Sequence, residues 1–135
     1  AQLVMGTVWQ ESRGKFLKQV GGGPALGVAQ MEPATHDDIW QHYLRRKNLL
    51  SRKVLSLVSA ANLNNILRPD SKELVTNLAY SVAMCRIHYF RCPAALPGAD
   101  NIAGQAEYWK KYYNTYLGKG TVEHYLNATV KQRFA

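Results

Sequence analysis

The segment that most constrains this chain lies near the N-terminus, where a short apolar helix would run into a glycine-rich loop. The first helix is expected over residues 1–12, because apolar side chains recur there at helical spacing. Gly14 follows, where a glycine often ends a helix. Residues 21–27 contain four glycines and no charged side chain, so the backbone there can approach other groups closely. Glu11 is therefore expected in the last turn of a mostly buried helix, pointing at the segment that follows.

A second carboxyl group lies beyond the glycine-rich loop. Gln30 and Glu32 follow it, and two carboxyls on either side of a tight backbone segment suit general acid–base chemistry on a glycosidic bond. Burial between Trp9 and the loop would raise the pKa of Glu11, so that this carboxyl stays protonated and can donate to the glycosidic oxygen. The alternative is a structural ion pair between Glu11 and Arg13 or a lysine.

Two motifs in this region resemble those of the lysozyme-like superfamily, which includes soluble lytic transglycosylases, goose-type lysozymes and phage muramidases. The signature of the superfamily is a Glu-Ser pair at the end of a helix, followed further along by Gly-Leu-Met-Gln. In this chain the pair is Glu11-Ser12, and residues 27–30 read Gly-Val-Ala-Gln. The pair and the tetrad together make the resemblance fairly specific, whereas either alone would be weak.

The residues after the tetrad combine the patterns of two branches. Pro33 and Thr35 lie near the transglycosylase pattern Gln-x-Met-Pro-x-Thr. Glu32 and His36 match the acidic residue and the histidine that follow the glutamine in goose-type lysozymes.

The resemblance implies a role for each of these side chains, and a plainer use stands beside each. Ser12 would support the acid or the nearby backbone, or it is a simple hydroxyl at the helix end. Gln30 would bind a sugar acetamido group, or its amide stabilises a turn. Glu32 would hold the attacking water, or it caps the helix that starts at Pro33. His36 is a substrate-binding candidate, although a structural hydrogen bond is the expected use of its ring.

A third motif lies near the C-terminal end of the chain. Tyr113-Asn114, followed by a glycine turn over residues 118–120, resembles the Ala-Tyr-Asn-Ala-Gly box of transglycosylases, in which a tyrosine lies near the catalytic glutamate. Here Tyr112 replaces the alanine, and residues 115–117 lengthen the loop. Tyr113 and Asn114 are therefore substrate-binding candidates. Most of the aromatic run around them follows helical spacing and is expected in the core; it comprises Tyr108, Trp109, Tyr112, Tyr113 and Tyr116.

The remaining sequence predicts a mainly α protein with a single domain over residues 1–135, and the resemblance implies that this domain is lysozyme-like. About six helices are expected, with at most a vestigial β element over residues 15–20. After the first, one helix is expected to start at Pro33 and another to cover residues 48–61, followed by a connector over residues 62–69. A long helix is expected to run from a capping box at residues 70–73 to a stop at Pro93. The last two helices are expected over residues 102–113 and from Thr121 onwards.

Charge and cysteine content restrict the partners. The net charge of +8 favours encounter with polyanions such as cell walls, nucleic acids or membrane surfaces. No apolar run is long enough for a membrane span. Cys85 and Cys92 would lie roughly 10 Å apart along one helix, too far for a disulfide, so free thiols are expected. No metal-ligand spacing accompanies these cysteines, so a zinc site is not expected, and the reaction that the resemblance implies needs no metal or cofactor.

The resemblance implies cleavage of the β-1,4 bond between N-acetylmuramic acid and N-acetylglucosamine in peptidoglycan glycan strands, with Glu11 as the general acid. A water held by Glu32 would make the chain a hydrolysing muramidase. Attack by the muramic 6-hydroxyl would instead make it a lytic transglycosylase with a 1,6-anhydro product. A non-catalytic virion or wall-binding protein that kept the fold is a further alternative. A nucleic-acid-binding module is disfavoured, because groove reading does not need Glu11 beside a glycine-rich loop.

The expected setting follows from the same features. No signal peptide is visible, and free thiols favour synthesis in a reducing compartment. These features suit a phage product that is made in the host cytoplasm and acts on the bacterial cell wall, either as an endolysin or as a virion component beside other virion proteins. A helix that starts at the first residue indicates that some upstream residues are missing.

Overall fold

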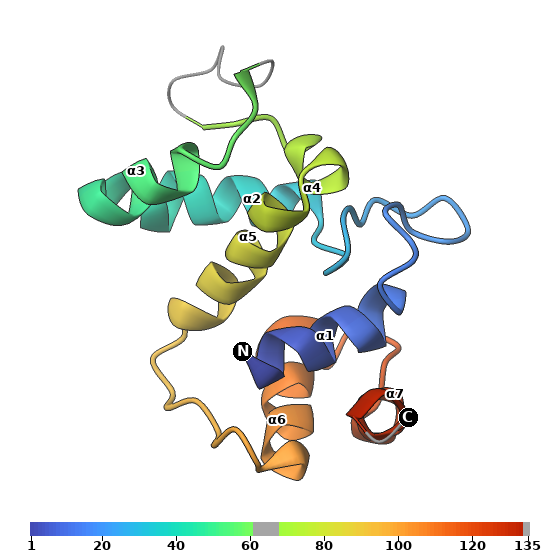
Figure 1. Ribbon diagram of the computed structural model, residues 1–135. Coiled ribbons are helices and arrows are strands. Elements are labelled where there is room, and N and C mark those ends of the chain that lie inside the picture. The colour runs from blue at the N-terminus through green and yellow to red at the C-terminus, as the bar shows by residue number, and fades with distance from the viewer. Residues whose placement is uncertain (61–67, 134–135) are drawn as a thin grey trace.

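The computed structural model describes residues 1–60 and 68–133, and it confirms a mainly α fold (Figure 1). Two isolated bridges, one between Lys18 and Leu26 and one between Leu26 and Met31, are all that remains of the expected β element in the described residues. The α-helices are α1 (Gln2–Ser12), α2 (Pro33–Asp38), α3 (Asn48–Leu55), α4 (Glu73–Thr76), α5 (Leu78–Phe90), α6 (Ile102–Trp109) and α7 (Val122–Arg133). Short π and 3₁₀ segments extend two of them: η1 (Ile39–Tyr43), η2 (Leu44–Arg46) and η4 (Lys110–Asn114).

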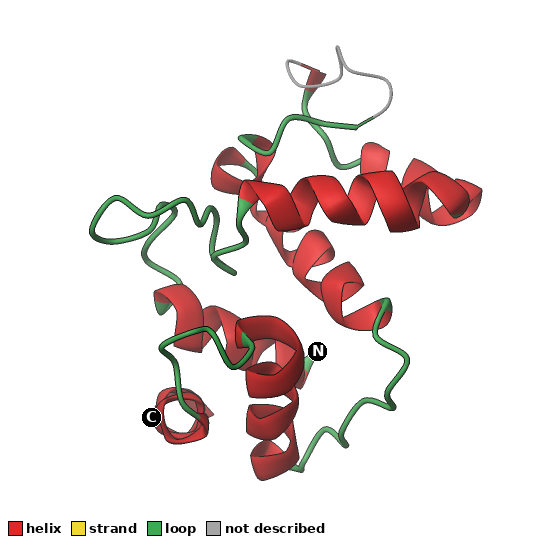
Figure 2. Ribbon diagram, turned by 180° about the vertical axis from the view of Figure 1, so that it is seen from behind, coloured by secondary structure: helices red, strands yellow, loops and turns green. Residues whose placement is uncertain are grey.

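The helices form two groups that α5 connects. Figures 1 and 2 show α2, α3 and α4 on one side and α1, α6 and α7 on the other, with α5 running between them. Two faces of α5 are buried in different clusters: Tyr80 and Met84 pack with the first group, whereas Cys85 and Tyr89 pack against Val4 of α1. A helix that is apolar on several faces is typical of the centre of a fold.

Close packing brings the first and last helices together. Gly6 of α1 lies against the Tyr125 ring of α7, so that a Cβ at this position would overlap the tyrosine hydroxyl. The Tyr125 hydroxyl donates to the Leu3 carbonyl at 3.2 Å. Thr121 caps α7 as predicted, because its Oγ1 accepts the His124 amide at 3.1 Å.

The predicted capping box is wrong, and the long helix that it was expected to open is broken in two. Helix α4 ends after one turn, and the Asn77 side chain then caps α5 by accepting the Tyr80 amide at 3.0 Å. The Glu73 carboxylate is buried and accepts the Ser59 amide at 2.7 Å and the Ser59 hydroxyl at 2.9 Å. An asparagine competes for backbone groups, so it starts a new helix here. Leu78, the first residue of α5, is 64% exposed.

Two further helix boundaries differ from the prediction. Helix α3 ends at Leu55, before the expected end at residue 61. Residue 61 and residues 62–67 of the expected connector lie outside the described residues. The predicted helix over residues 102–113 changes to the π-helical segment η4 after Trp109. Cys85 and Cys92 are both free, as predicted. Within the described part of the chain, every helix is too short or too polar to span a bilayer.

Candidate active site

The end of α1 presents Glu11 to the interior of a cleft. Arg13 and Gly14 have φ values of 55° and 69°, so the left-handed turn that ends the helix begins at Arg13, one residue before Gly14. The Trp109 indole N–H of α6 donates to Glu11 Oε1 at 2.9 Å. No ion pair among the described residues involves Glu11, so the ion-pair alternative with Arg13 is not supported.

The environment of Glu11 favours its neutral form. Burial raises the pKa of this carboxyl to about 7, although the hydrogen bond from Trp109 acts in the opposite direction. A carboxyl with such a pKa is protonated in a substantial fraction of molecules at neutral pH. It can therefore serve as a proton donor there, which an ordinary surface glutamate cannot.

Ser12 joins the end of α1 to the glycine-rich loop. Its hydroxyl is buried, donates to the Val28 carbonyl at 2.6 Å and accepts the Gly14 amide at 3.1 Å. Ser12 does not line the cleft. Of its two predicted uses, the geometry therefore corresponds to support of the backbone next to Glu11, and direct substrate contact is not supported.

The loop itself is held against α4 and α5. Gly27 has a φ of 74°, and a Cβ at this position would overlap the Leu74 carbonyl and come within 2.6 Å of Ser81 Oγ. Gln30 also has a positive φ, 49°, and its side-chain amide donates to the Gly27 carbonyl at 2.9 Å. The Gln30 amide thus stabilises the turn that contains it, while Gln30 also lines the cleft.

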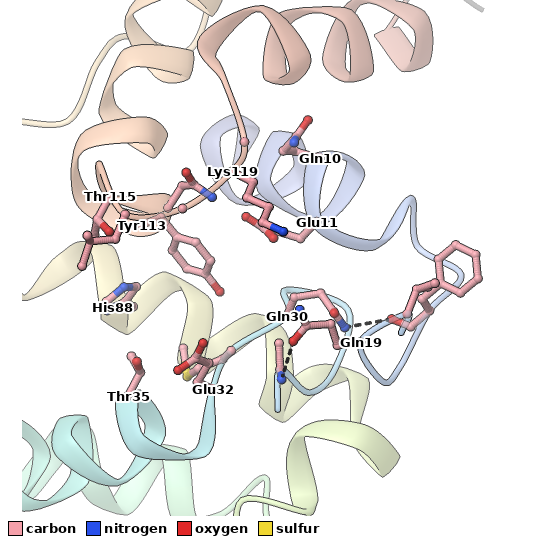
Figure 3. Close-up of a pocket in the computed structure, with 18 residues that line it drawn as sticks. Gln10, Glu11, Gln19, Gln30, Glu32, Thr35, His88, Tyr113, Thr115 and Lys119 are labelled. Carbon is pink, nitrogen blue, oxygen red and sulfur yellow. Dashed lines mark hydrogen bonds between the residues drawn. The ribbon is translucent and has the colours of Figure 1, made fainter. Parts of the chain in front are cut away.

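The cleft has a volume of about 750 Å³ and is lined by residues from both helix groups (Figure 3). Its wall includes five of the seven predicted site residues: Glu11, Gln30, Glu32, Tyr113 and Asn114. Figure 3 shows Glu11 and Glu32 on opposite sides of this space. The structure therefore brings together residues that lie up to about a hundred positions apart in the chain.

Glu32 is exposed and occupies the position just before α2. Its backbone is extended, and its side chain makes no capping hydrogen bond, so the capping alternative is not supported. No hydrogen bond or ion pair of the described residues uses its carboxylate. This group faces the cleft and can accept a hydrogen bond from a water molecule or a ligand there.

Tyr113 and Asn114, from the third sequence motif, also line the cleft. The Tyr113 hydroxyl donates to the Ala29 carbonyl at 2.7 Å, and burial raises its pKa well above the ordinary value. Asn114 Oδ1 accepts from Lys110 Nζ at 2.7 Å, and the same ammonium donates to the Gly118 carbonyl at 2.9 Å. Tyr113 thus holds the glycine-rich loop, and Asn114 shapes the turn that follows η4.

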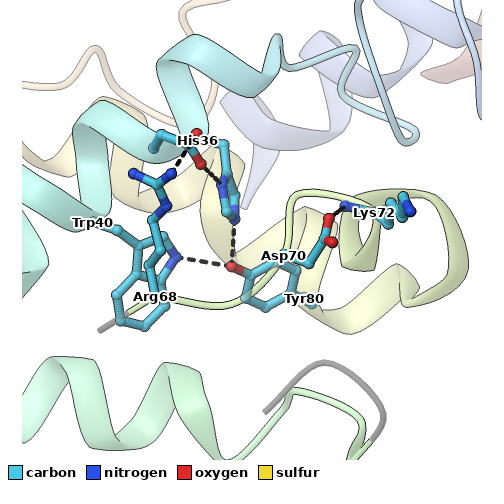
Figure 4. A network of polar contacts seen from close by, with 7 residues as sticks. His36, Trp40, Arg68, Asp70, Lys72 and Tyr80 are labelled. Atoms are coloured by element: carbon cyan, nitrogen blue, oxygen red, sulfur yellow. Dashed lines mark hydrogen bonds and ion pairs between the residues drawn. The ribbon is translucent and has the colours of Figure 1, made fainter. Parts of the chain in front are cut away.

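His36 lies outside the cleft, in the network of Figure 4. Its Nε2 lies 2.7 Å from the Tyr80 hydroxyl, which accepts the Trp40 indole N–H at 2.8 Å. The Asp37 carboxylate, 2.9 Å from Nδ1, can only accept, so Nδ1–H donates to it, and Nε2 of the neutral ring accepts a hydrogen bond from the Tyr80 hydroxyl. Burial lowers the pKa of His36, which keeps the ring neutral. Its inclusion among the substrate-binding candidates is not supported, and the structural use that was expected of its ring is what the structure shows.

The sequence analysis missed the contact between Trp109 and Glu11 and several cleft residues. Trp109 lies in the core, as its place in a helical aromatic stripe predicted, and its indole N–H also holds Glu11. Gln19, His88 and Lys119 line the cleft; the first two belong to no motif, and Lys119 lies within the glycine turn of the third motif, which did not single it out. Only the three-dimensional contact between α6 and α1 identifies Trp109, so local sequence signals could not have found it.

No group of three or more histidine, cysteine, aspartate or glutamate side chains among the described residues is placed to hold a metal ion. Comparison with known proteins adds no identification: no family model, no curated protein and no solved structure matches this chain.

Proposed function

We propose that this chain is a muramidase that cleaves the β-1,4 bond between N-acetylmuramic acid and N-acetylglucosamine in peptidoglycan. The observation that carries the proposal is the Glu11 carboxyl, whose pKa burial raises to about 7 at the wall of a cleft that also holds Glu32. The resemblance of residues 11–12, 27–36 and 113–114 to lysozyme-like motifs agrees with this assignment.

Glu11 acts as the general acid in this proposal. Its proton passes to the glycosidic oxygen as the bond from that oxygen to the anomeric carbon breaks, and the sugar ring develops oxocarbenium character. The Trp109 N–H fixes one carboxyl oxygen of Glu11 and supports the carboxylate that remains after proton transfer. Ser12 and Tyr113 hold the loop that faces this carboxyl through the carbonyls of Val28 and Ala29.

Glu32 completes the hydrolytic reaction from the opposite side of the cleft. Its carboxylate takes a proton from a water molecule, whose oxygen then bonds to the anomeric carbon and gives a hydrolysed reducing end. The carboxylate has no hydrogen-bond partner among the described residues, and this leaves it available for the water. If the muramic 6-hydroxyl attacks instead, the product is a 1,6-anhydro sugar, and the chain is a lytic transglycosylase.

The biological setting of the proposal is a phage product that acts on the bacterial cell wall. The net charge of +8 suits an anionic wall as the partner. An endolysin and a virion component share this chemistry.

Digestion of purified peptidoglycan, followed by mass spectrometry of the released muropeptides, tests the proposal. Wild-type protein should release muropeptides with hydrolysed reducing ends. Glu11→Gln should abolish release because its amide cannot donate the proton, whereas Glu107→Gln, an exposed control on α6, should retain it. Release of muropeptides by Glu11→Gln at the wild-type rate would contradict the proposal.

Glu32→Gln separates the two possible products in the same assay. Hydrolysis should fall on the order of 10²–10⁴-fold if Glu32 is a general base. Melting of this variant should match wild type, because the exposed carboxylate makes no capping bond. A 1,6-anhydromuramyl product from the wild-type protein would reject hydrolysis and leave Glu11 in its role.

A further inference from the structure

His88 is one of the polar side chains of the cleft that have no part in the mechanism above. His88 of α5 lines the cleft, as do Thr35 and Glu32 (Figure 3). Its Nδ1 lies 3.1 Å from the Arg91 guanidinium, and the same guanidinium donates to Asp38 Oδ2 of α2 at 2.6 Å. Asp38, Arg91 and His88 thus form a chain of polar contacts that ends at the cleft wall.

This chain fixes the position of the imidazole proton. A guanidinium has donors and no acceptor, so His88 Nδ1 must be the unprotonated acceptor of the contact. The proton of the neutral ring is therefore on Nε2. Burial, and after it the positive charge of Arg91, lowers the pKa of His88 to about 4, so the ring stays neutral at neutral pH.

The ring is also fixed in orientation. The Tyr113 ring of η4 meets it edge to face, with the centroids 4.9 Å apart and the planes at 72°. Tyr113 is in turn held by its hydrogen bond to the Ala29 carbonyl. No acceptor among the described residues receives His88 Nε2–H, so a rigid donor at the cleft wall lacks a protein partner.

We propose that His88 Nε2–H donates a hydrogen bond to an acceptor oxygen of the bound glycan, and that Arg91 and Asp38 are positioning residues that keep the proton on Nε2. This inference rests on the proposed function for the identity of the ligand. It does not depend on which groups carry out bond cleavage.

The charged and titratable groups around the ring come from several elements. Arg91, directly after α5, opposes protonation of His88, whereas Asp38 of α2 favours it, and the effect of Arg91 is the larger of the two. Tyr113 of η4 is neutral, because burial raises its pKa. Glu11, Glu32 and Lys119 share the cleft with the ring. His88 therefore keeps its Nε2–H donor at neutral pH. Removal of Arg91 should let the proton occupy either ring nitrogen and should raise the pKa of His88.

Nitrogen NMR of the histidine rings in the free protein tests the tautomer without any substrate. His88 should be neutral with its proton on Nε2 from pH 8 to about pH 5, since its pKa is about 4. In Arg91→Met the tautomers should mix and the ring should titrate at higher pH. A wild-type ring protonated at Nδ1, or charged at pH 6, would overturn the proposal.

Binding of a chitin oligosaccharide tests contact with the glycan. His88→Phe should bind it roughly five- to tenfold more weakly, the loss expected for one hydrogen bond, and His88→Gln should recover part of the affinity because its amide donates. In turnover the loss should be found in KM rather than kcat. Unchanged affinity in both variants would overturn the proposal, and so would binding loss in Gln as large as in Phe.

The same assay separates this proposal from the proposed function. Wild-type protein that binds the oligosaccharide through His88 but releases no muropeptides would reject the muramidase and keep His88 in its role. Muropeptide release together with unchanged binding in the His88 variants would keep the muramidase and reject the role of His88. Absence of binding by the wild type would reject the role of His88, while muropeptide release would still decide the muramidase.

Discussion

At the scale of single residues, Glu11 combines a protein hydrogen bond with an unfavourable environment for charge. Trp109 orients the carboxyl, while burial raises its pKa to about 7. In the unfolded chain the same group titrates near 4.5. Between these values the folded state binds more protons than the unfolded state, so the contribution of Glu11 to stability is present at low pH and is lost as the pH rises through 7.

Glu11→Gln should therefore stabilise the protein at alkaline pH. The amide keeps the shape of the side chain and never ionises, so its advantage over wild type should be about 2–3 kcal/mol larger at pH 8.5 than at pH 4. Urea unfolding at both pH values measures this difference. Glu107→Gln on the exposed face of α6 should show no such gain. An equal effect of Glu11→Gln at both pH values would show that folding does not raise the pKa of Glu11.

At the scale of elements, the glycine-rich loop connects the two helix groups at the cleft. Ser12 of α1 and Tyr113 of η4 donate to the carbonyls of Val28 and Ala29, directly after this loop, and Gly27 packs on the Leu74 carbonyl of α4. Because Gly27 is in the left-handed region and lacks space for a Cβ, the sequence has little freedom at this position.

Gly27→Ala should cost more stability than Gly21→Ala. Both glycines have positive φ, 74° and 87°, so both variants pay a similar backbone cost. Only Gly27→Ala adds a collision with the Leu74 carbonyl, because a Cβ at Gly21 meets nothing within 4 Å. The extra loss should be about 1–3 kcal/mol, measured by urea unfolding. Equal losses would mean that the loop does not pack on α4 as described.

Local patterns predicted the elements better than the contacts between them. Helical spacing and glycine placement located α1, the loop and the cap of α7 at Thr121, because each depends on neighbouring residues. The break at Asn77 was missed, since an asparagine cap inside an apolar stripe resembles an ordinary helix position. The contact from Trp109 to Glu11 and the orientation of His88 depend on how α1, α5 and η4 meet, and no local pattern encodes that.

At the scale of the whole molecule, a net charge of +8 should assist encounter with an anionic wall. The rate of wall lysis should therefore fall as ionic strength rises from about 10 mM to 150 mM, because salt screens the attraction. Binding of an uncharged chitin oligosaccharide provides the control and should change little. A lysis rate that stays constant over this range would show that the charge plays no part.

The pH–rate profile of glycan cleavage at constant ionic strength tests the central claim most directly, because it reports the protonation of Glu11 during the reaction. The rate at low substrate concentration should fall as the pH rises, with an apparent pKa of about 7. Trp109→Phe removes the hydrogen bond that lowers this pKa, so its descending limb should shift to higher pH. A profile without a descending limb between pH 6 and 8.5 would contradict the assignment of Glu11 as the acid.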